Sequence, residues 1–443
     1  MPALDEKYGK FSRDEKDDLK HAQVTVENRV VPDIQDDSEG ASLEYPDGGL
    51  RAWLVVLGAV CNHFSTFGYG TSWGTFQAYY QDHILQDSTP SAIAWIGSIQ
   101  FSLCFITGML YGRLFDKGYY RSMLTISSLL VIVATFLVAE CKVYWQFVLC
   151  QGVAIGLGNG GIYSVNVPII AHWFERRRGL AIGLVTAGAA AGGVFFPIVI
   201  RVMLPRVGFQ WCMRIIGFIL LAMLGLGNLL LKTRLPPSKI RLRERSLRQI
   251  FLSSAYNVYC ICGFTAFLGI YTALTFFNSI AVSYGIDPNF AIYLTSIVNG
   301  VSGVSRLLCG IFVDRWGALN VMIPFTLISA ISTYAWPFAR DEASLVTVAV
   351  IYGFATGAFI SAIVNPIFKM GASEDFGLRV GLANTFIGAG ALVGPPISGA
   401  IQKSSGGYNA VGYYAGSVVL LATIQMVITR QLLLGRAVVR GKI

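Results

Sequence analysis

Charged residues are scarce in this chain of 443 residues: Asp, Glu, Lys and Arg together make up 13%, against about 25% in a typical soluble domain. Hydrophobic residues account for 54%, and the mean hydropathy is +0.57. The few charges leave uninterrupted apolar runs of about 18 residues or more, the length that crosses a bilayer. The shortage of charge therefore excludes an ordinary soluble fold and predicts an integral membrane protein.

Signatures of several other classes are missing as well. The start, MPALDEKYGKFSRDEKDD, has no apolar segment and predicts no cleavable signal peptide. No Asn-x-Ser/Thr glycosylation acceptor occurs. The sequence contains no nucleotide-binding loop, no nucleophile–base pair and no cluster of metal ligands. We therefore expect neither an enzyme nor a protein that holds a metal or a cofactor.

Twelve apolar blocks are long enough to cross a membrane. Backbone groups in lipid must bond to one another, and the blocks lack the alternation over about ten residues that barrel strands show, so we expect helices. The predicted cores are 53–80, 92–112, 120–139, 145–171, 179–200, 210–231, 254–283, 290–313, 319–338, 344–368, 380–401 and 410–430.

The distribution of Lys and Arg predicts the orientation. If the N-terminal tail is cytoplasmic, the inner segments hold twenty of these residues and the outer loops hold five. Such an excess is typical of cytoplasmic loops, so we expect both termini inside. The location we expect is the plasma membrane, with an internal membrane as the alternative that these residues leave open. The net charge of +9 then needs no nucleic acid to explain it.

Four regions follow from this pattern. Residues 1–50 are charged and poor in large apolar side chains, which is typical of a disordered tail, here cytoplasmic. Residues 51–231 and 253–443 each hold six predicted spans. The linker between them, 232–252, contains KTRLPPSKIRLRERSLRQ, and we expect this basic cytoplasmic segment to lie on the anionic inner leaflet.

A fixed spacing of 198 residues relates the two halves. Gly112, Asp116 and Lys117 in YGRLFDKGYYR match Gly310, Asp314 and Arg315 in CGIFVDRWGAL at this spacing. The same offset pairs Ser98–Ile99 with Ser296–Ile297, Pro168 with Pro366, Gly183 with Gly381, Gly192 with Gly390, and Pro197 with Pro395. The chain is therefore predicted to be a duplicated six-helix unit, with a substrate site near the midplane between the halves.

The repeated Gly-x-x-x-Asp-Arg/Lys element resembles the loop signature of the major facilitator superfamily, which lies after spans 2 and 8. The resemblance implies an all-α integral membrane fold of 12 transmembrane helices in two six-helix pseudo-repeats. A carboxylate at a helix end can pair with a basic residue or a neighbouring helix N-terminus and hold one face closed. The predicted gating residues are Gly112, Arg113, Asp116, Lys117, Gly310, Asp314 and Arg315. The alternative is that these charges only fix the topology.

Two stretches resemble the monocarboxylate transporter-like (monocarboxylate porter) family. YPDGGLRAWLVVLGAV (45–60) is similar to its entry to span 1, and HWFERRRGLAIGLVTAGAAAGG (172–193) to its span-5 motif. TSWGTFQAYY (71–80) and GFQWCMRIIGF (208–218) resemble the fungal branch. Members of that branch include carboxylate carriers, a riboflavin carrier and exporters encoded beside secondary-metabolite pathways, so the resemblance leaves the substrate open.

Arg306 is the most informative charge within a predicted span, because charges are costly in lipid. It precedes Asp314 by eight residues, about 12 Å along a helix, which places it near the midplane of a ~30 Å core. It also matches the span-8 arginine of the monocarboxylate family. Its planar fork suits a substrate carboxylate; the alternative is a structural bond to backbone carbonyls or a polar helix.

Two positions depart from the proton-coupled members of that family. Ser302 stands where they carry an acidic residue one turn before the arginine, and Thr71 or a neighbour stands where they carry a lysine. A simple proton/lactate mechanism is therefore disfavoured. His63 in span 1 could carry a proton instead, although a lone histidine also fits as a packing residue. The other predicted substrate-binding residues are Tyr69, Thr71, Asn159, Tyr163, Asn278, Asn299, Asn365 and Asn384.

The main hypothesis is a secondary carrier of a small organic anion, monocarboxylate-like, that works by alternating access. Its partners would be the substrate and the lipid bilayer, with coupling to protons left open. The alternative is an exporter of an uncharged or aromatic secondary metabolite, or a riboflavin-like importer. A non-transporting membrane sensor is a third hypothesis, motivated by the acidic tail and the basic linker.

Overall fold

The computed structural model describes residues 46–234, 250–371, 376–435 and 441. Every regular element in these ranges is helical, which confirms the all-α prediction. Most of the predicted tail (1–50) and of the predicted linker (232–252) lies outside the described residues.

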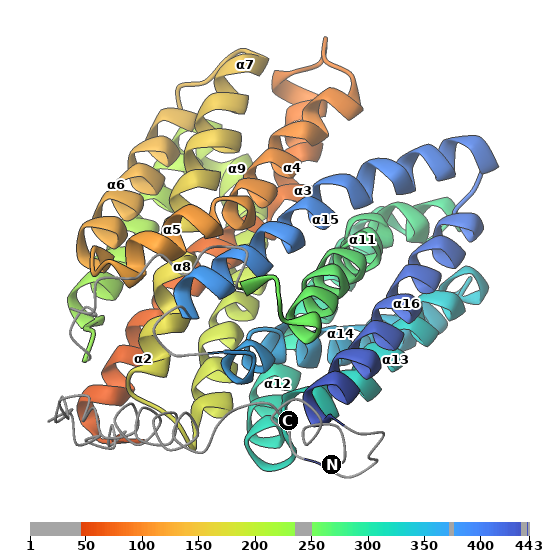
Figure 1. Cartoon of the computed structure of the whole chain (residues 1–443). Coiled ribbons are helices and arrows are strands. Elements are labelled where there is room, and N and C mark those ends of the chain that lie inside the picture. Colours follow the sequence, from red (N-terminus) through yellow and green to blue (C-terminus); the bar gives the residue numbers. More distant parts are fainter. Residues whose placement is uncertain (1–45, 235–249, 372–375, 436–440, 442–443) are drawn as a thin grey trace, which may run out of the picture. The chain divides into compact units, whose positions relative to one another are not determined.

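The helices of the first half follow the predicted spans (Figure 1). They are α2 (Leu50–His63), η1 (Phe64–Gly68), α3 (Trp73–Tyr79) and η2 (Tyr80–Ile84) in span 1; α4 (Pro90–Ile106) and α5 (Gly108–Asp116) in span 2; α6 (Tyr120–Val138) in span 3; α7 (Tyr144–Phe147), η3 (Val148–Ala154) and α8 (Ile155–Ala171) in span 4; and α9 (Arg178–Leu230) in spans 5 and 6.

The second half continues in the same way. Its elements are α11 (Ser254–Ser283) in span 7; α12 (Pro288–Trp316) in span 8; α13 (Ala318–Ala335) and η4 (Trp336–Phe338) in span 9; α14 (Glu342–Ala362) and η5 (Asn365–Lys369) in span 10; α15 (Phe376–Ser405) in span 11; and α16 (Asn409–Leu434) in span 12.

Helix α9 comprises two spans. Its 53 residues would extend about 80 Å at ~1.5 Å per residue, far beyond a ~30 Å hydrocarbon core. At Gly208 the backbone leaves helical geometry (φ 75°, ψ 171°), which a glycine adopts without strain. The described residues contain 11 helices that are long and apolar enough to cross a membrane. Because α9 supplies two spans, the predicted twelve are present.

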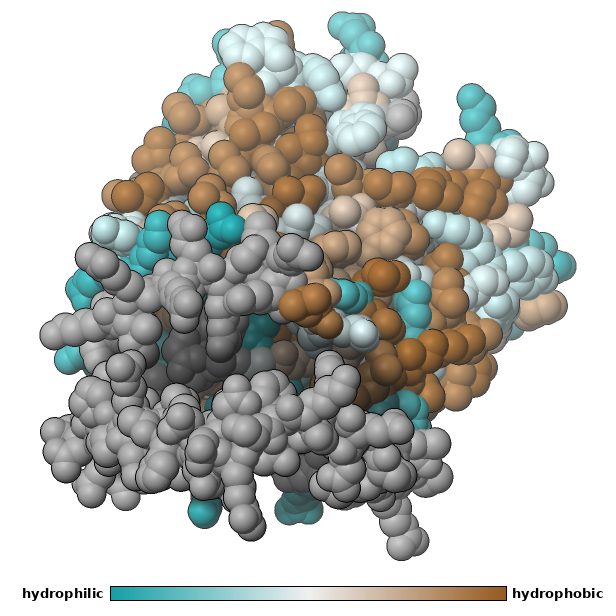
Figure 2. All heavy atoms as spheres, viewed as in Figure 1, coloured by the Kyte–Doolittle hydropathy of each residue, from teal (hydrophilic) through white to brown (hydrophobic). Residues whose placement is uncertain are grey.

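The outer faces of the helices are apolar, as lipid contact requires. Helix α6 exposes Leu129, Val133 and Leu137 by more than half of their surface, while it buries Ser128 and Thr135. Figure 2 shows apolar side chains over much of the visible flank. Polar groups face inward because lipid offers them no hydrogen bonds. The described helices are therefore apolar on their outer faces as well as in the buried core.

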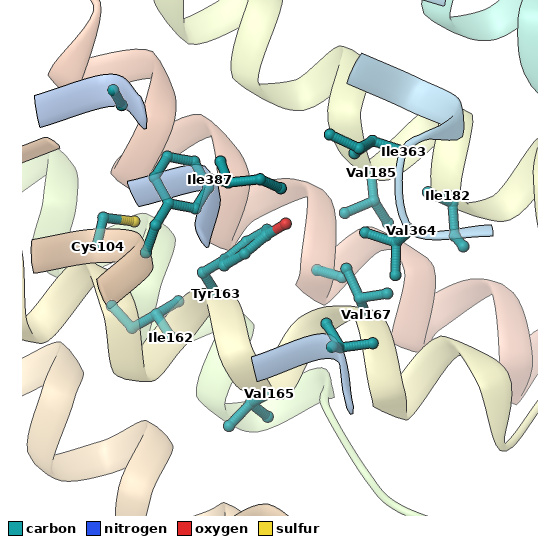
Figure 3. Packing of buried hydrophobic residues seen from close by; sticks show 14 of the residues in the cluster. Cys104, Ile162, Tyr163, Val165, Val167, Ile182, Val185, Ile363, Val364 and Ile387 are labelled. Carbon is teal, nitrogen blue, oxygen red and sulfur yellow. The ribbon is translucent and has the colours of Figure 1, made fainter. Parts of the chain in front are cut away.

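Apolar side chains of both halves share one buried cluster. Figure 3 shows part of it: Ile182 and Val185 of α9 lie near Ile363 and Val364, which follow α14. These pairs come from opposite halves of the chain. The halves are therefore closely packed against each other along this part of the cluster.

Asp47 fastens the start of span 1 to the segment before α9. Its Oδ1 accepts hydrogen bonds from the backbone N–H groups of Glu175 (2.7 Å), Arg176 (2.7 Å) and Arg177 (3.3 Å). The ring of Trp53 packs on Phe174, with 5.1 Å between centroids. The two stretches that resemble the monocarboxylate family are thus in direct contact, although they are far apart in the sequence.

Candidate functional site

Asp314, at the end of α12, caps the start of α9. Its Oδ1 accepts the backbone N–H of Gly179 (2.6 Å) and its Oδ2 that of Leu180 (2.9 Å). The first N–H groups of a helix lack partners within the helix and carry the positive end of its dipole, so a carboxylate stabilises them. This bond joins the second half of the chain to the first.

Asp116, at the end of α5, makes the equivalent contact in the other direction. Its carboxylate accepts the backbone N–H groups of Gly377 (3.2 Å) and Leu378 (2.9 Å) at the start of α15. The donors of this bond lie 198 residues after Gly179 and Leu180. We call the two contacts the carboxylate caps, and the end of the bundle where they lie the capped end.

Glycines allow the helices to approach each other beside the caps. A Cβ on Gly112 would overlap the carbonyl of Gly377, and one on Gly310 would meet the carbonyl of Gly179 at 2.5 Å. The predicted Gly residues therefore serve close backbone packing between the halves. The basic members of the predicted gating set, Arg113, Lys117 and Arg315, are exposed. Their gating role stays a prediction.

Arg306 links the two halves nearer the middle of the bundle. Its guanidinium is buried, with 7% of the residue exposed. Nη1 donates to the carbonyl of Thr186 on α9 (2.6 Å), and Nε donates to Ser302 Oγ one turn earlier on α12 (3.2 Å). Ser302, which replaces the family's acidic residue, thus holds the arginine in place. This geometry matches the structural alternative in part, because backbone and hydroxyl groups already occupy two of its donors.

His63 closes a hydrogen-bond chain between spans 1 and 4. Asn62 Nδ2 donates to Asn166 Oδ1 (2.9 Å), and Asn166 Nδ2 contacts His63 Nδ1 at 3.0 Å. All three residues are buried, and His63 Nε2 has no partner among the described residues. The π-helical segment η1 begins directly after His63, and such segments are frequent at functional sites.

Six aromatic residues, which we call the aromatic cluster, meet between the halves: Phe67, Phe101, Phe105, Tyr163, Phe267 and Tyr271. Two ring contacts cross from one half to the other, Phe101–Tyr271 at 4.5 Å and Phe105–Phe267 at 5.9 Å between centroids. Within the first half, Tyr163 stands edge-on to Phe67 at 5.1 Å. Figure 3 shows Tyr163 near Cys104 and Ile387.

A small cavity lies against this cluster. It is lined by Thr66, Phe67, Gly70, Gln100, Phe101, Cys104 and Asn159, and its volume is about 10 Å³, enough for about one water molecule. Asn159 Oδ1 is buried without a partner among the described residues. The cavity therefore combines apolar ring faces with an unsatisfied acceptor.

The remaining predicted residues divide into central and peripheral positions. Thr71 and Asn299 both lie beside Gly193, because a Cβ there would meet Thr71 Oγ1 at 2.8 Å and the Asn299 side-chain amide at 3.3 Å. Tyr69 is buried and its hydroxyl has no partner among the described residues. Asn384 lies beside Tyr163.

One predicted residue is not brought into this centre, and the side chain of another is not described. Asn365 belongs to η5, beyond the end of α14, where its Nδ2 donates to the carbonyl of Ser361 (3.4 Å). The side chain of Asn278 in α11 lies outside the described ones. Part of the predicted set is therefore gathered between the halves, whereas Tyr69 packs on Phe76 and Phe196 within the first half.

The central residues that were not predicted are Thr186, Phe101, Phe105 and Phe267. Thr186 contributes only its backbone carbonyl, which no side-chain pattern reveals. Phe101 and Phe105, like Phe267 and Tyr271, stand four residues apart on one helix, a spacing that puts both rings on one face. That spacing was the available signal for the aromatic cluster.

Comparison with known proteins gives extensive matches. The model of the Major Facilitator Superfamily matches residues 56–277 and 259–433. MFS-type transporter 1 of Ophiocordyceps sp. (strain BCC 1869) is 33% identical over 389 residues, which cover 87% of each chain. The aspyridones efflux protein apdF of Emericella nidulans is 34% identical over 383 residues, which cover 86% of this chain and 78% of that protein.

A solved structure has the same fold. The transporter FucP in its outward conformation superimposes with a TM-score of 0.68 at 14% identity, covering 85% of this chain and 99% of that one. Together with the family match and the curated relatives, this likeness leads to one conclusion: the chain belongs to the Major Facilitator Superfamily of membrane transporters.

Proposed function

We propose that this transporter exports a bulky, mainly apolar metabolite with a flat ring system, by alternating access. The observation that carries the proposal is the aromatic cluster, because it places ring faces from both halves at one point. A flat molecule that enters between Phe101 and Tyr271 exchanges one ring contact for two, each worth about 0.5–1.5 kcal/mol. Membership of a transporter family confirms that the chain is not an enzyme.

The state of Arg306 supports the same proposal. A carrier built around a substrate carboxylate needs an arginine whose fork is open to the cavity. Here Nη1 and Nε are bonded to Thr186 and Ser302, so a carboxylate bound by two donors of the fork in this geometry would displace one of these bonds. The name of one relative, an aspyridones efflux protein, also favours export over uptake.

The orientation follows from the charge pattern. We place the capped end on the cytoplasmic side, because the Lys and Arg excess lies in the segments on that side. The location that we propose is the plasma membrane. The carboxylate caps then close the cytoplasmic face in the conformation described. Because the central cavity holds only about one water molecule, the halves must separate before a metabolite can enter.

A second candidate is the carrier of a small organic anion, as the monocarboxylate resemblance predicts. One observation favours it: Arg306 is a buried cation at the contact of the two halves, and a buried cation attracts an anionic substrate. This narrower family assignment remains a prediction.

One experiment separates the two candidates. The chain is expressed in yeast cells that lack their own drug pumps, and two fluxes are measured: efflux of Nile red, a neutral aromatic dye, and uptake of ¹⁴C-lactate. The proposal predicts energy-dependent Nile red efflux and lactate uptake equal to that of cells carrying an empty vector. Lactate uptake without Nile red efflux would overturn it in favour of the anion carrier.

A further inference from the structure

We infer that His63 is a neutral hydrogen-bond donor that recognises an acceptor, such as a ring carbonyl, on the substrate. The inference rests on the proposed function and names the substrate class within it. It begins from the order of the hydrogen bonds around the ring. Asn62 donates its Nδ2–H to Asn166 Oδ1, which fixes the orientation of the Asn166 amide.

The Asn166 amide in turn fixes the tautomer of His63. Its Nδ2, 3.0 Å from His63 Nδ1, can only donate. With the two amides oriented in this way, His63 Nδ1 accepts, and a neutral imidazole then carries its proton on Nε2. The two asparagines are positioning residues: without touching the substrate, they make Nε2 a donor.

This donor has no partner among the described residues. The residue is 2% exposed, and an unsatisfied buried donor lowers the stability of the folded protein. An acceptor on a bound ligand would form the missing hydrogen bond with Nε2 and remove this loss of stability, as expected of a ligand-binding group. A histidine with a purely structural role would have a permanent hydrogen-bond partner for Nε2.

The surroundings of the ring indicate what carries the acceptor. His63 lies against two members of the aromatic cluster, Phe67 at 5.5 Å and Tyr163 at 5.8 Å between centroids. Arg306 is the charged group that acts electrostatically on it. A conjugated ring system with a carbonyl on its edge meets both requirements, since its faces pack on the rings while its oxygen accepts from Nε2.

A matched pair of probes tests this assignment. Fluorenone and fluorene share one ring skeleton, and only fluorenone has a carbonyl. Their affinities for the purified full chain are measured by quenching of tryptophan fluorescence. We compare the wild type with H63Q, which keeps an N–H donor and cannot take up a proton, and with H63L, which has no donor. H83Q is the control, because His83 is exposed on η2.

The expected result is that the wild type binds fluorenone about tenfold more tightly than fluorene, a typical effect of one buried hydrogen bond. H63L should lose this preference, whereas H63Q and H83Q should keep it. In an N166L variant, no amide donates to His63 Nδ1, so the proton of His63 can occupy either ring nitrogen. This variant should show a smaller preference for fluorenone over fluorene, while its affinity for fluorene stays unchanged.

Other outcomes separate the role assigned to His63 from the aromatic substrate site itself. If H63L keeps the carbonyl preference, the assignment of His63 is wrong while the aromatic site stands. If folded wild-type protein binds neither probe, the proposed function fails together with the inference. If H63Q binds like H63L and its Nile red efflux no longer depends on pH, His63 carries a proton instead, and the donor role is refuted.

Discussion

Asp116 and Asp314 stand 198 residues apart and make the same contact in opposite directions. Each carboxylate ends a helix of its own half and caps the first N–H groups of a helix in the other half. The repeated charged element thus forms bonds between the two halves, and not only within one of them. It joins the halves at one end twice, with equal geometry.

The caps should contribute to the stability of the described conformation. Asp314→Asn removes the charge and leaves one carbonyl oxygen as an acceptor, so we expect a loss of about 2 kcal/mol and a lower unfolding temperature. Asp116→Asn should behave alike, and the double variant should show the sum. Thermal unfolding in detergent measures this; unchanged unfolding of both single variants would contradict the contact.

Close glycine packing beside the caps predicts a sharp contrast within α15. In Gly381→Ala the new Cβ would overlap the carbonyl of Gly108. A Cβ added at Gly399 would have nothing within 4 Å. Alanine is otherwise favoured over glycine in a helix by about 1 kcal/mol. We therefore expect Gly381→Ala to lower the unfolding temperature and efflux, and Gly399→Ala to leave both intact or to raise stability.

Arg306 should respond to a substitution that keeps its charge. A lysine at this position cannot bond to Thr186 and Ser302 at once, because it lacks the fork. We expect Arg306→Lys to destabilise the protein and to slow Nile red efflux, with the KM for the dye nearly unchanged. Arg206→Lys, at an exposed position on α9, is the control. A KM for Nile red that rises at least tenfold would instead indicate direct contact with the substrate.

His172, just after α8, predicts a dependence of stability on pH. Burial lowers its pKa from 6.5 to about 4, since desolvation disfavours the charged ring. Above about pH 6.5 the ring is neutral in both the folded and the unfolded chain. As the pH falls toward 4, the unfolded chain takes up a proton that the folded protein does not, so the free energy of unfolding decreases. The unfolding temperature should drop between pH 7 and pH 5, and less so in His172→Gln. Equal slopes in the two proteins would refute this role.

The fold was largely predictable because each signal was repeated along the chain. Apolar runs, loop charges and the 198-residue offset all indicated the same twelve spans. The boundary inside α9 was also visible as two blocks, and the backbone leaves helical geometry between them at Gly208. The Gly and Asp positions of the caps were predicted because the offset marks them directly.

The site was harder to predict from the sequence. Arg306 was identified correctly as buried and central, but its partner is a backbone carbonyl, which leaves no trace in residue types. Asn159, well inside span 4, lines the cavity, whereas Asn365, which follows α14, bonds to the end of its own helix. The cross-half ring contacts depend on how two six-helix units meet, which periodicity within one helix cannot specify.

The central claim is that aromatic residues from both halves form the substrate site. Its most direct test is the rate of Nile red efflux in Phe101→Ala and Tyr271→Ala cells, compared with Phe218→Ala, a lipid-facing ring on α9 that is 56% exposed. All three variants must first reach the membrane in equal amounts. The account predicts at least a tenfold loss of efflux in the first two variants and none in the third. Equal efflux in all three would contradict it.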